Sequence, residues 1–270
     1  MAEGVAFAQG PLSNWTILVG DDEVALIDTG YPSDIDLVLE SIDRAGGTGL
    51  PISTALITHG HSDHLGSARE LRRRFNTTVL APVNELPNVR RQVTEQITFA
   101  DVLPKLWRPR VATWLWRAVR AGGLKEVGVV DAQSVGDSPL IVAGHTVVPI
   151  PTPGHSTGHT AYHLLEAGAV ATGDAIVTAH PTSRVQGPQL LPDMFHANPA
   201  RARSALASIA RVSASTILPG HGPLLHGSPA TSVSLAWALA PSGQTHPGAR
   251  SGPMPDAWSQ DCRRLWAMTR

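Results

Sequence analysis

The most constraining feature of this 270-residue chain is a pattern that recurs four times: an apolar, strand-forming run, a small residue, and then histidine or aspartate. The first instance is the densest, because the run at 55–58 leads directly into a segment with four side chains that can bind metal. Since strand ends meet at one edge of a sheet, we expect the polar side chains of all four instances to form one cluster. These side chains are His59, His61, Asp63, His64, His155, Asp174 and His221.

Other short β-branched runs, each cut off by a turn, extend the strand pattern along the chain. Strands are predicted over 15–19, 24–28, 55–58, 77–81, 140–142, 147–150, 160–165, 169–172 and 216–218. The turns at Asp21-Asp22 and Ala143-Gly144 indicate hairpins, so part of the sheet is antiparallel. Helices are predicted over 34–45, over 65–75 and after Asn198, which is a good N-cap. The fold class is therefore mixed, α/β or α+β.

Residues 101–121 interrupt this alternation with a helical, cationic insertion. Val111, Trp114 and Ala118 fall on one face of a helix and predict packing against the rest of the protein. Five basic residues against one acidic residue give the segment a local charge of +4, although the whole chain carries only −1. From residue 240 to the end, Pro, Gly, Ser and Gln without periodicity indicate a loose tail.

Charge and composition exclude several classes of function. A net charge of −1 and a pI near 6.9 provide no field that would attract nucleic acid or an anionic membrane. The sequence has no apolar stretch long enough to span a bilayer, and its start does not resemble a signal peptide. The only cysteine, Cys262, has no partner for an internal disulfide. We therefore expect a cytoplasmic protein whose partner is a small-molecule substrate; the oligomeric state stays open.

The segment over residues 59–64 has a geometry that can bind two metal ions. In extended backbone His59 and His61 point to the same side, whereas Asp63 and His64 lie beyond the tight turn that Gly60 permits and face a second direction. Imidazole and carboxylate ligands without a thiolate favour Zn²⁺, and Mn²⁺ or Fe²⁺ accept the same set. The sequence thus predicts two zinc ions as cofactors.

These motifs, from Thr58 to His64 with His155, Asp174 and His221, resemble the metallo-β-lactamase superfamily. The resemblance covers roughly residues 14–226 and implies an α+β fold, a four-layer αββα sandwich of two mixed sheets flanked by helices. It implies a catalytic domain over 1–239, with the tail at 240–270 outside it. It also implies that His59, His61 and His155 hold one metal, that Asp63, His64 and His221 hold the other, that Asp174 bridges both, and that Asp28 supports a ligand from beneath.

The resemblance is to the glyoxalase II-like branch of that superfamily, which implies a binuclear zinc hydrolase. A metal-bridging hydroxide would attack the carbonyl of a small ester, thioester or lactone, with Asp63 as the catalytic residue that orients the water or carries its proton. Glyoxalase II adds a helical, basic C-terminal domain for glutathione, and the stretch after Ala240 does not look like one. A specific glutathione thioester is therefore not predicted.

Three alternatives stay open. A related branch binds one iron through positions matching His59, His155 and Asp174 or nearby, and oxidises persulfides. Hydrolysis of β-lactams is disfavoured, because antibiotic-cleaving members generally lack an aspartate at the position of Asp174. A catalytically inactive metal-binding protein is the third alternative, and the intact set of seven ligands disfavours it.

Four residues are candidates for contacting the substrate, each with a simpler structural interpretation. Tyr31 follows the turn after Asp28, and Trp116 lies off the apolar face of the insertion, where an ordinary exposed position is favoured. His180 and His196 follow Asp174 in a predicted loop, and for both a solvated histidine is the favoured interpretation. None of the remaining histidines, His159 and His163 included, is assigned to metal.

Overall fold

The computed structural model describes residues 3–239, which form two six-stranded sheets and the helices around them. The first sheet contains, in spatial order, β1 (Val5–Gln9), β2 (Asn14–Val19), β3 (Val24–Ile27), β4 (Ile52–Leu56), β5 (Thr78–Pro82) and β6 (Gln133–Val135). The second contains β12 (Leu225–His226), β11 (Thr216–Pro219), β10 (Ala169–Gly173), β9 (Thr160–Leu164), β8 (His145–Pro151) and β7 (Leu140–Val142). Each sheet mixes parallel and antiparallel pairs.

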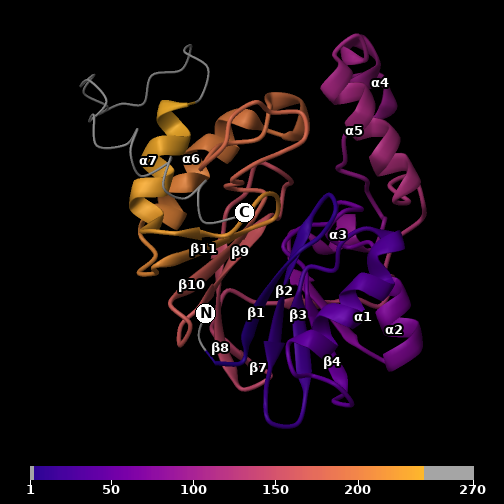
Figure 1. The fold of residues 1–270 in the computed structure, drawn as a ribbon, viewed down its shortest axis with the longest axis vertical. Coiled ribbons are helices and arrows are strands. Elements are labelled where there is room, and N and C mark those ends of the chain that lie inside the picture. The colour runs from indigo at the N-terminus through magenta and orange to yellow at the C-terminus, as the bar shows by residue number, and fades with distance from the viewer. Residues whose placement is uncertain (1–2, 240–270) are drawn as a thin grey trace. The chain divides into compact units, whose positions relative to one another are not determined.

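The helical segments are η1 (Pro32–Asp34), α1 (Ile35–Arg44), α2 (Ala68–Phe75), α3 (Leu86–Val89), α4 (Phe99–Val102), η2 (Leu103–Lys105), α5 (Pro109–Arg120), η3 (Asp193–Phe195), α6 (Pro199–Ala210) and α7 (Pro229–Ala238). Helices α1 and α2 cover the outer face of the first sheet and α6 and α7 that of the second, while other helical segments lie at the strand ends (Figure 1). Val38 and Ile42 of α1 and Leu71 of α2 pack on the first sheet. On the opposite side, α6 and α7 pack on each other and cover the second sheet. The predicted αββα sandwich is confirmed.

The alternation of side chains along each strand explains why the two sheets stack. In β2, Leu18 points to the core between the sheets, whereas its neighbour Ile17 points to the layer under the helices. The central core joins Leu18 to Tyr162 and Leu164 of β9, all of them fully buried or nearly so. Burial on both faces therefore holds every central strand in one register.

Most predicted elements are present, with informative differences. The hairpins β2–β3 and β7–β8 are antiparallel as expected, and Asn198 caps α6 by accepting a hydrogen bond from the backbone of Arg201. Three strands were missed: β6 and β12 have three and two residues, and β1 precedes the first predicted run. The insertion is helical but broken into α4, η2 and α5, because Pro104 and Pro109 cannot continue a helix.

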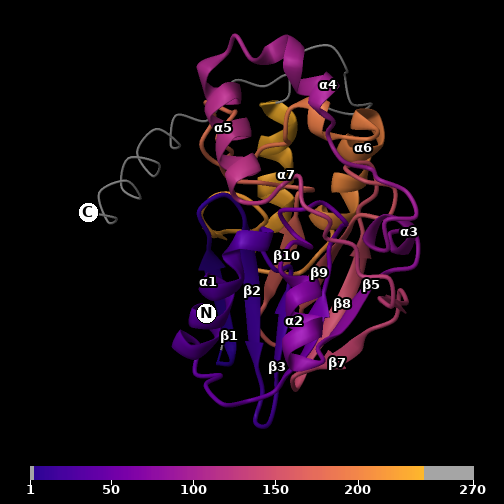
Figure 2. The ribbon, with the colours of Figure 1, turned by 90° about the vertical axis from the view of Figure 1, so that its right-hand side faces the viewer.

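The insertion stands apart from the sandwich layers. In both views α4 and α5 lie at the top, beyond the ends of the strands (Figures 1 and 2). Between residues 3 and 239, no helix combines the length and apolar character needed to cross a membrane. The predicted tail from residue 240 onward lies outside the described residues.

Candidate metal centre

Loops that follow four strands bring the seven predicted side chains to one edge of the sandwich. The loop after β4 in the first sheet carries His59 to His64, and the loops after β8, β10 and β11 in the second sheet carry the other three. A bend after each strand turns the chain at this edge. At Gly154 the backbone angle φ is +128°, and an added Cβ would lie 2.0 Å from the backbone of Ala202, so glycine is required before His155.

The side chains form adjoining groups whose ligand atoms lie within 4.8 Å of one another. One group joins His59, His61 and His155, and another joins Asp63, His64 and His221. The Nε2 of His155 is 3.0 Å from the Nδ1 of His61, and the Nε2 of His221 is 3.3 Å from the carboxylate of Asp63. Each group thus has the number and kind of ligands that a zinc ion takes.

Asp174 lies between the two groups. Its Oδ2 is 3.3 Å from the Nε2 of His155, while its Oδ1 is 3.3 Å from the Nε2 atoms of His64 and His221. One carboxylate therefore faces nitrogen atoms of both groups. A shared carboxylate is the arrangement that brings two metal ions to ~3.5 to 4 Å from each other.

Several buried polar atoms of the site make no hydrogen bond with the rest of the described residues. Over the described residues, His59 Nε2, His64 Nε2 and Asp174 Oδ1 are buried and make no hydrogen bond. Leaving such atoms unsatisfied costs about 1 to 3 kcal/mol each. All three belong to the cluster and face ligand atoms of neighbouring residues, so metal ions fit the donor set that the chain provides.

The charges of the cluster attract cations. Burial alone would raise the pKa of Asp63, but the charge of His64 and the hydrogen bond from His221 hold it at about 2. Burial alone would lower the pKa of His221, but the charges of Asp174 and Asp63, whose carboxylates lie 3.3 Å from its Nε2, raise it to about 10. Two buried carboxylates thus stabilise positive charge on the imidazoles. Metal ions at the same position would supply that charge instead.

Asp28 lies beneath the cluster, as the resemblance implies. Its Oδ2 accepts a hydrogen bond of 2.8 Å from the Nδ1 of His64, and its carboxylate also accepts from the backbone N–H and the hydroxyl of Thr58. With Nδ1 engaged in this way, the Nε2 of His64 faces Asp63 and Asp174. Such a carboxylate–histidine pair fixes the tautomer and the orientation of a metal ligand.

Sequence reasoning missed a second support, Glu85. This fully buried carboxylate follows β5 and joins the two loops that carry most of the histidines. Its Oε1 accepts from the backbone N–H of Gly60 and from Asn88, and its Oε2 accepts from the hydroxyl of Ser156 and the backbone N–H of Gly158, at 2.7 to 2.8 Å. No local pattern marks Glu85, because every partner except Asn88 is distant in the sequence.

His159 also has a role that its position in the sequence does not reveal. Burial lowers its pKa to about 3, so the ring is neutral. Its Nε2 accepts a hydrogen bond of 3.1 Å from the backbone N–H of Asp174, and its Nδ1 lies 2.8 Å from the hydroxyl of Thr152. His159 therefore positions the loop of Asp174. His159 lies outside the ligand groups of the described residues.

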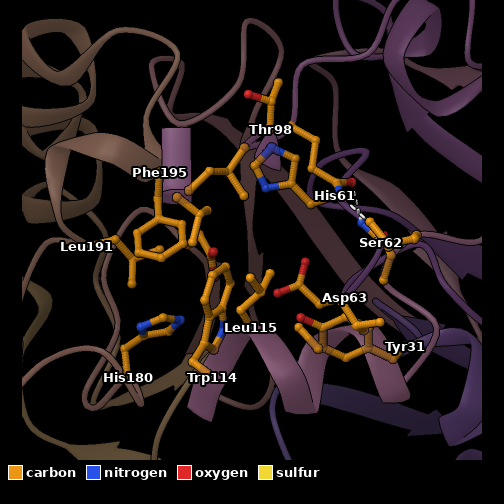
Figure 3. A pocket seen from close by; sticks show the side chains of 18 of the residues that line it. Tyr31, His61, Ser62, Asp63, Thr98, Trp114, Leu115, His180, Leu191 and Phe195 are labelled. Carbon is orange, nitrogen blue, oxygen red and sulfur yellow. Dashed lines mark hydrogen bonds between the residues drawn. The ribbon is translucent and has the colours of Figure 1, made fainter. Parts of the chain in front are cut away.

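A cavity opens onto the cluster, and its outer wall comes from the insertion (Figure 3). His61, Asp63 and Tyr31 line one side, and Trp114, Phe195 and Leu191 line the other. Trp114 packs edge-on against Phe195, with ring centroids 5.2 Å apart. The cavity thus combines a polar floor at the metal ligands with largely apolar walls.

The four residues that were candidates for contacting the substrate lie at different places relative to the cavity. Tyr31 and His180 are buried and line the cavity. Trp116 does not line it; the side chain is 60% exposed beside Arg120, and the neighbouring turn presents Trp114 to the cavity instead.

His196 contacts the cluster rather than the cavity, with its Nδ1 3.2 Å from that of His155. The favoured interpretation of His180 as a solvated histidine was wrong, whereas His196 is half-buried and for it that interpretation stays a prediction. The loop after Asp174 folds over the site, so that His180 is buried and burial lowers the pKa of both rings.

A sequence profile of the metallo-beta-lactamase superfamily matches residues 9–221, a range that contains all seven candidate ligands. The chain belongs to the metallo-beta-lactamase superfamily. The family expected from the motifs is therefore confirmed. The described residues place adjoining groups of His and Asp side chains that could hold metal at one edge of the αββα sandwich.

Relatives with assigned names extend the comparison. The hydroxyacylglutathione hydrolase of Chelativorans sp. (strain BNC1) is 28% identical over 166 residues, which are 60% of this chain and 48% of the relative. The probable metallo-hydrolase YflN of Bacillus subtilis (strain 168) is 24% identical over 214 residues, 73% of this chain and 74% of the relative. The chain thus spans about half the length of the hydroxyacylglutathione hydrolases that it matches.

Solved structures agree on the fold. The metallo-beta-lactamase family protein TTHA1429 from Thermus thermophilus superposes with a TM-score of 0.63 at 21% identity, covering 88% of this chain and 79% of that protein. At this identity the likeness concerns the fold, and function has to be argued from the site itself.

Proposed function

We propose that this superfamily member is a binuclear zinc hydrolase that cleaves a small ester, thioester or lactone. The observation that carries the proposal is the shared position of Asp174, whose two oxygens face one ligand group each. In this assignment His59, His61 and His155 hold one ion, and Asp63, His64 and His221 hold the other.

The metal supplies the reactive chemistry when it is bound: zinc lowers the pKa of a coordinated water toward ~7 and stabilises negative charge on a carbonyl oxygen. The chain's own residues position the reactants. Asp63 and Asp174 both line the cavity; because Oδ2 of Asp63 faces the Nε2 atoms of His221 and His64, we assign its other oxygen the role of accepting a proton from the attacking water. The apolar side chains of Trp114, Leu191 and Phe195 exclude solvent from the opposite wall.

The relatives support acyl hydrolysis as the reaction class. Several carry the name hydroxyacylglutathione hydrolase, and others are named as probable metallo-hydrolases. The chain spans about half of the former, so the proposal takes only the reaction class from these names and does not extend to a glutathione carrier.

Metal analysis combined with a substrate panel tests the proposal. We expect about two zinc ions per chain and turnover of at least one class among lactones, thioesters and aryl esters. The Asp63→Asn variant should keep most of its bound metal and lose turnover, whereas the His61→Ala, Asp174→Ala double variant should lose both. One iron per chain with oxygen uptake would instead support the persulfide dioxygenase. Activity of the wild type no higher than that of the double variant would support a binding protein.

A further inference from the structure

We propose that a groove beside the catalytic cavity binds a phosphorylated small molecule of about nucleotide size. The groove lies between the segment that enters α5 and the loop before α6, and it has a volume of about 820 Å³. That volume is in the range of sites for small organic ligands, and it exceeds what a single phosphate ion would fill. We call it the cationic groove, after Lys105, Arg108, Arg110 and Arg184 in its walls.

Basic side chains outnumber acidic ones in the cationic groove. Four basic side chains line it against one carboxylate, Asp193, in a chain with a net charge of −1. The basic residues come from two segments that are far apart in the sequence, so the fold itself gathers them. Like charges on neighbouring surfaces repel one another, which makes such a cluster unfavourable unless an anion binds there.

The hydrogen bonds of these side chains leave their charges available. Arg110 donates to the carbonyl of Ser183 at 3.0 Å, and Lys105 donates to the carbonyl of Asp101 at 3.1 Å. Within residues 3–239, none of the ion pairs includes any of the four basic groups, whereas Arg44 and Arg73 elsewhere on the surface pair with glutamates. Neutral carbonyl partners orient the cations without cancelling their charge.

Two further features favour phosphate and an attached ring. The first turn of the twelve-residue helix α5 lines the groove at Pro109 to Val111, and the N-terminal end of a helix carries partial positive charge that attracts phosphate. Trp107, 75% exposed, lies in the same wall with Arg108 stacked on its ring at 5.0 Å. A flat aromatic face beside guanidinium groups is suited to stack a nucleobase while the phosphates contact the cations.

The cationic groove and the catalytic cavity share their walls. Helix α5 contributes Val111 to the groove and Trp114 to the cavity, and the loop before α6 contributes Pro192 to the groove and Leu191 to the cavity. The phosphates could therefore belong to the substrate itself or to a separate ligand. Both sources present the same chemistry to the groove.

Calorimetric titration of the purified metal-loaded protein with ADP, pyrophosphate and adenosine at 50 mM salt tests this inference. We expect ADP and pyrophosphate to bind and adenosine to bind at least 10-fold more weakly than ADP. The Arg110→Gln, Arg184→Gln double variant should bind ADP at least 10-fold more weakly than the wild type. The matched control Arg201→Gln, Arg211→Gln removes two exposed charges of α6 and its C-terminal end and should bind like the wild type.

Further experiments distinguish whether the phosphates belong to the substrate or to a separate ligand, and they test the alternative ligands. A Trp107→Ala variant should weaken binding of ADP and leave pyrophosphate unchanged. Competitive inhibition of hydrolysis by ADP would place the phosphates on the substrate, and a changed rate at saturating substrate would indicate a separate ligand. The proposal would be overturned if ADP did not bind, or if the Arg110→Gln, Arg184→Gln variant bound ADP as well as the wild type does. Binding only to phosphatidylserine vesicles or to single-stranded DNA would overturn it as well. Repeating the titration with the His61→Ala, Asp174→Ala variant makes the result independent of hydrolysis.

Discussion

Replacing Glu85 by glutamine is a sensitive test of how the two ligand loops are held together. The carboxylate accepts four hydrogen bonds, and glutamine has the same shape but one acceptor oxygen and one amide donor. If the amide faces the second loop, the hydroxyl of Ser156 can turn to accept from it. The backbone N–H of Gly158 cannot, and it is left buried without an acceptor.

The expected loss in the free energy of unfolding follows from this count of hydrogen bonds. An unsatisfied buried N–H costs about 1 to 3 kcal/mol, and each of the two bonds from Gly60 and Asn88 loses about 1 kcal/mol when its acceptor becomes neutral. Burial of a neutral amide costs less than burial of a carboxylate and offsets part of this loss. We therefore expect the free energy of unfolding to fall by about 2 to 4 kcal/mol.

Urea unfolding followed by circular dichroism, with EDTA present so that metal does not add to the stability, measures this change. With a slope of about 2 kcal/mol per M, the midpoint should fall by roughly 1 to 2 M. Zinc affinity, measured by chelator competition, should fall about 10- to 100-fold. Glu166→Gln is the matched control, because this carboxylate is exposed and accepts from the backbone of Thr146 at the surface, so that it should change stability by less than about 0.5 kcal/mol. Equal midpoints for the two variants would refute the role assigned to Glu85.

Three further predictions concern the same site. Asp28→Asn removes the charged partner of His64 and should weaken zinc binding about 10- to 100-fold in chelator competition, and unchanged affinity would contradict its supporting role. Trp114→Ala should cost about 3 to 5 kcal/mol in urea unfolding and raise KM, whereas Trp116→Ala, at an exposed position, should cost less than about 1 kcal/mol; equal losses would show that both rings pack alike. In zinc-free protein the carboxylates raise the pKa of His221 to about 10, above its value when unfolded. This stabilisation is complete below about pH 6.5 and is lost as the pH rises to 10, so a urea midpoint that stays flat over that range would count against it.

Local sequence determined the ends of the strands and the ligands placed just beyond them. A β-branched run, a small residue and a histidine or aspartate depend on neighbours in the chain, and this pattern indicated all seven side chains that the structure brings together. The same local logic identified the hairpin turns and the cap at Asn198. It also identified the apolar stripe of α5, because helical periodicity is a property of a single segment.

The tertiary structure alone decided which other residues serve the site. Glu85 and His159 act through hydrogen bonds to loops that are distant in the sequence, and no short-range pattern records such partners. His180 was expected in solvent, but the fold closes its loop over the cluster and buries it. Likewise, Trp114 rather than Trp116 faces the cavity because the rotation of α5 is set by what its apolar stripe packs against. Periodicity defines a face of a helix, and only packing determines what that face meets.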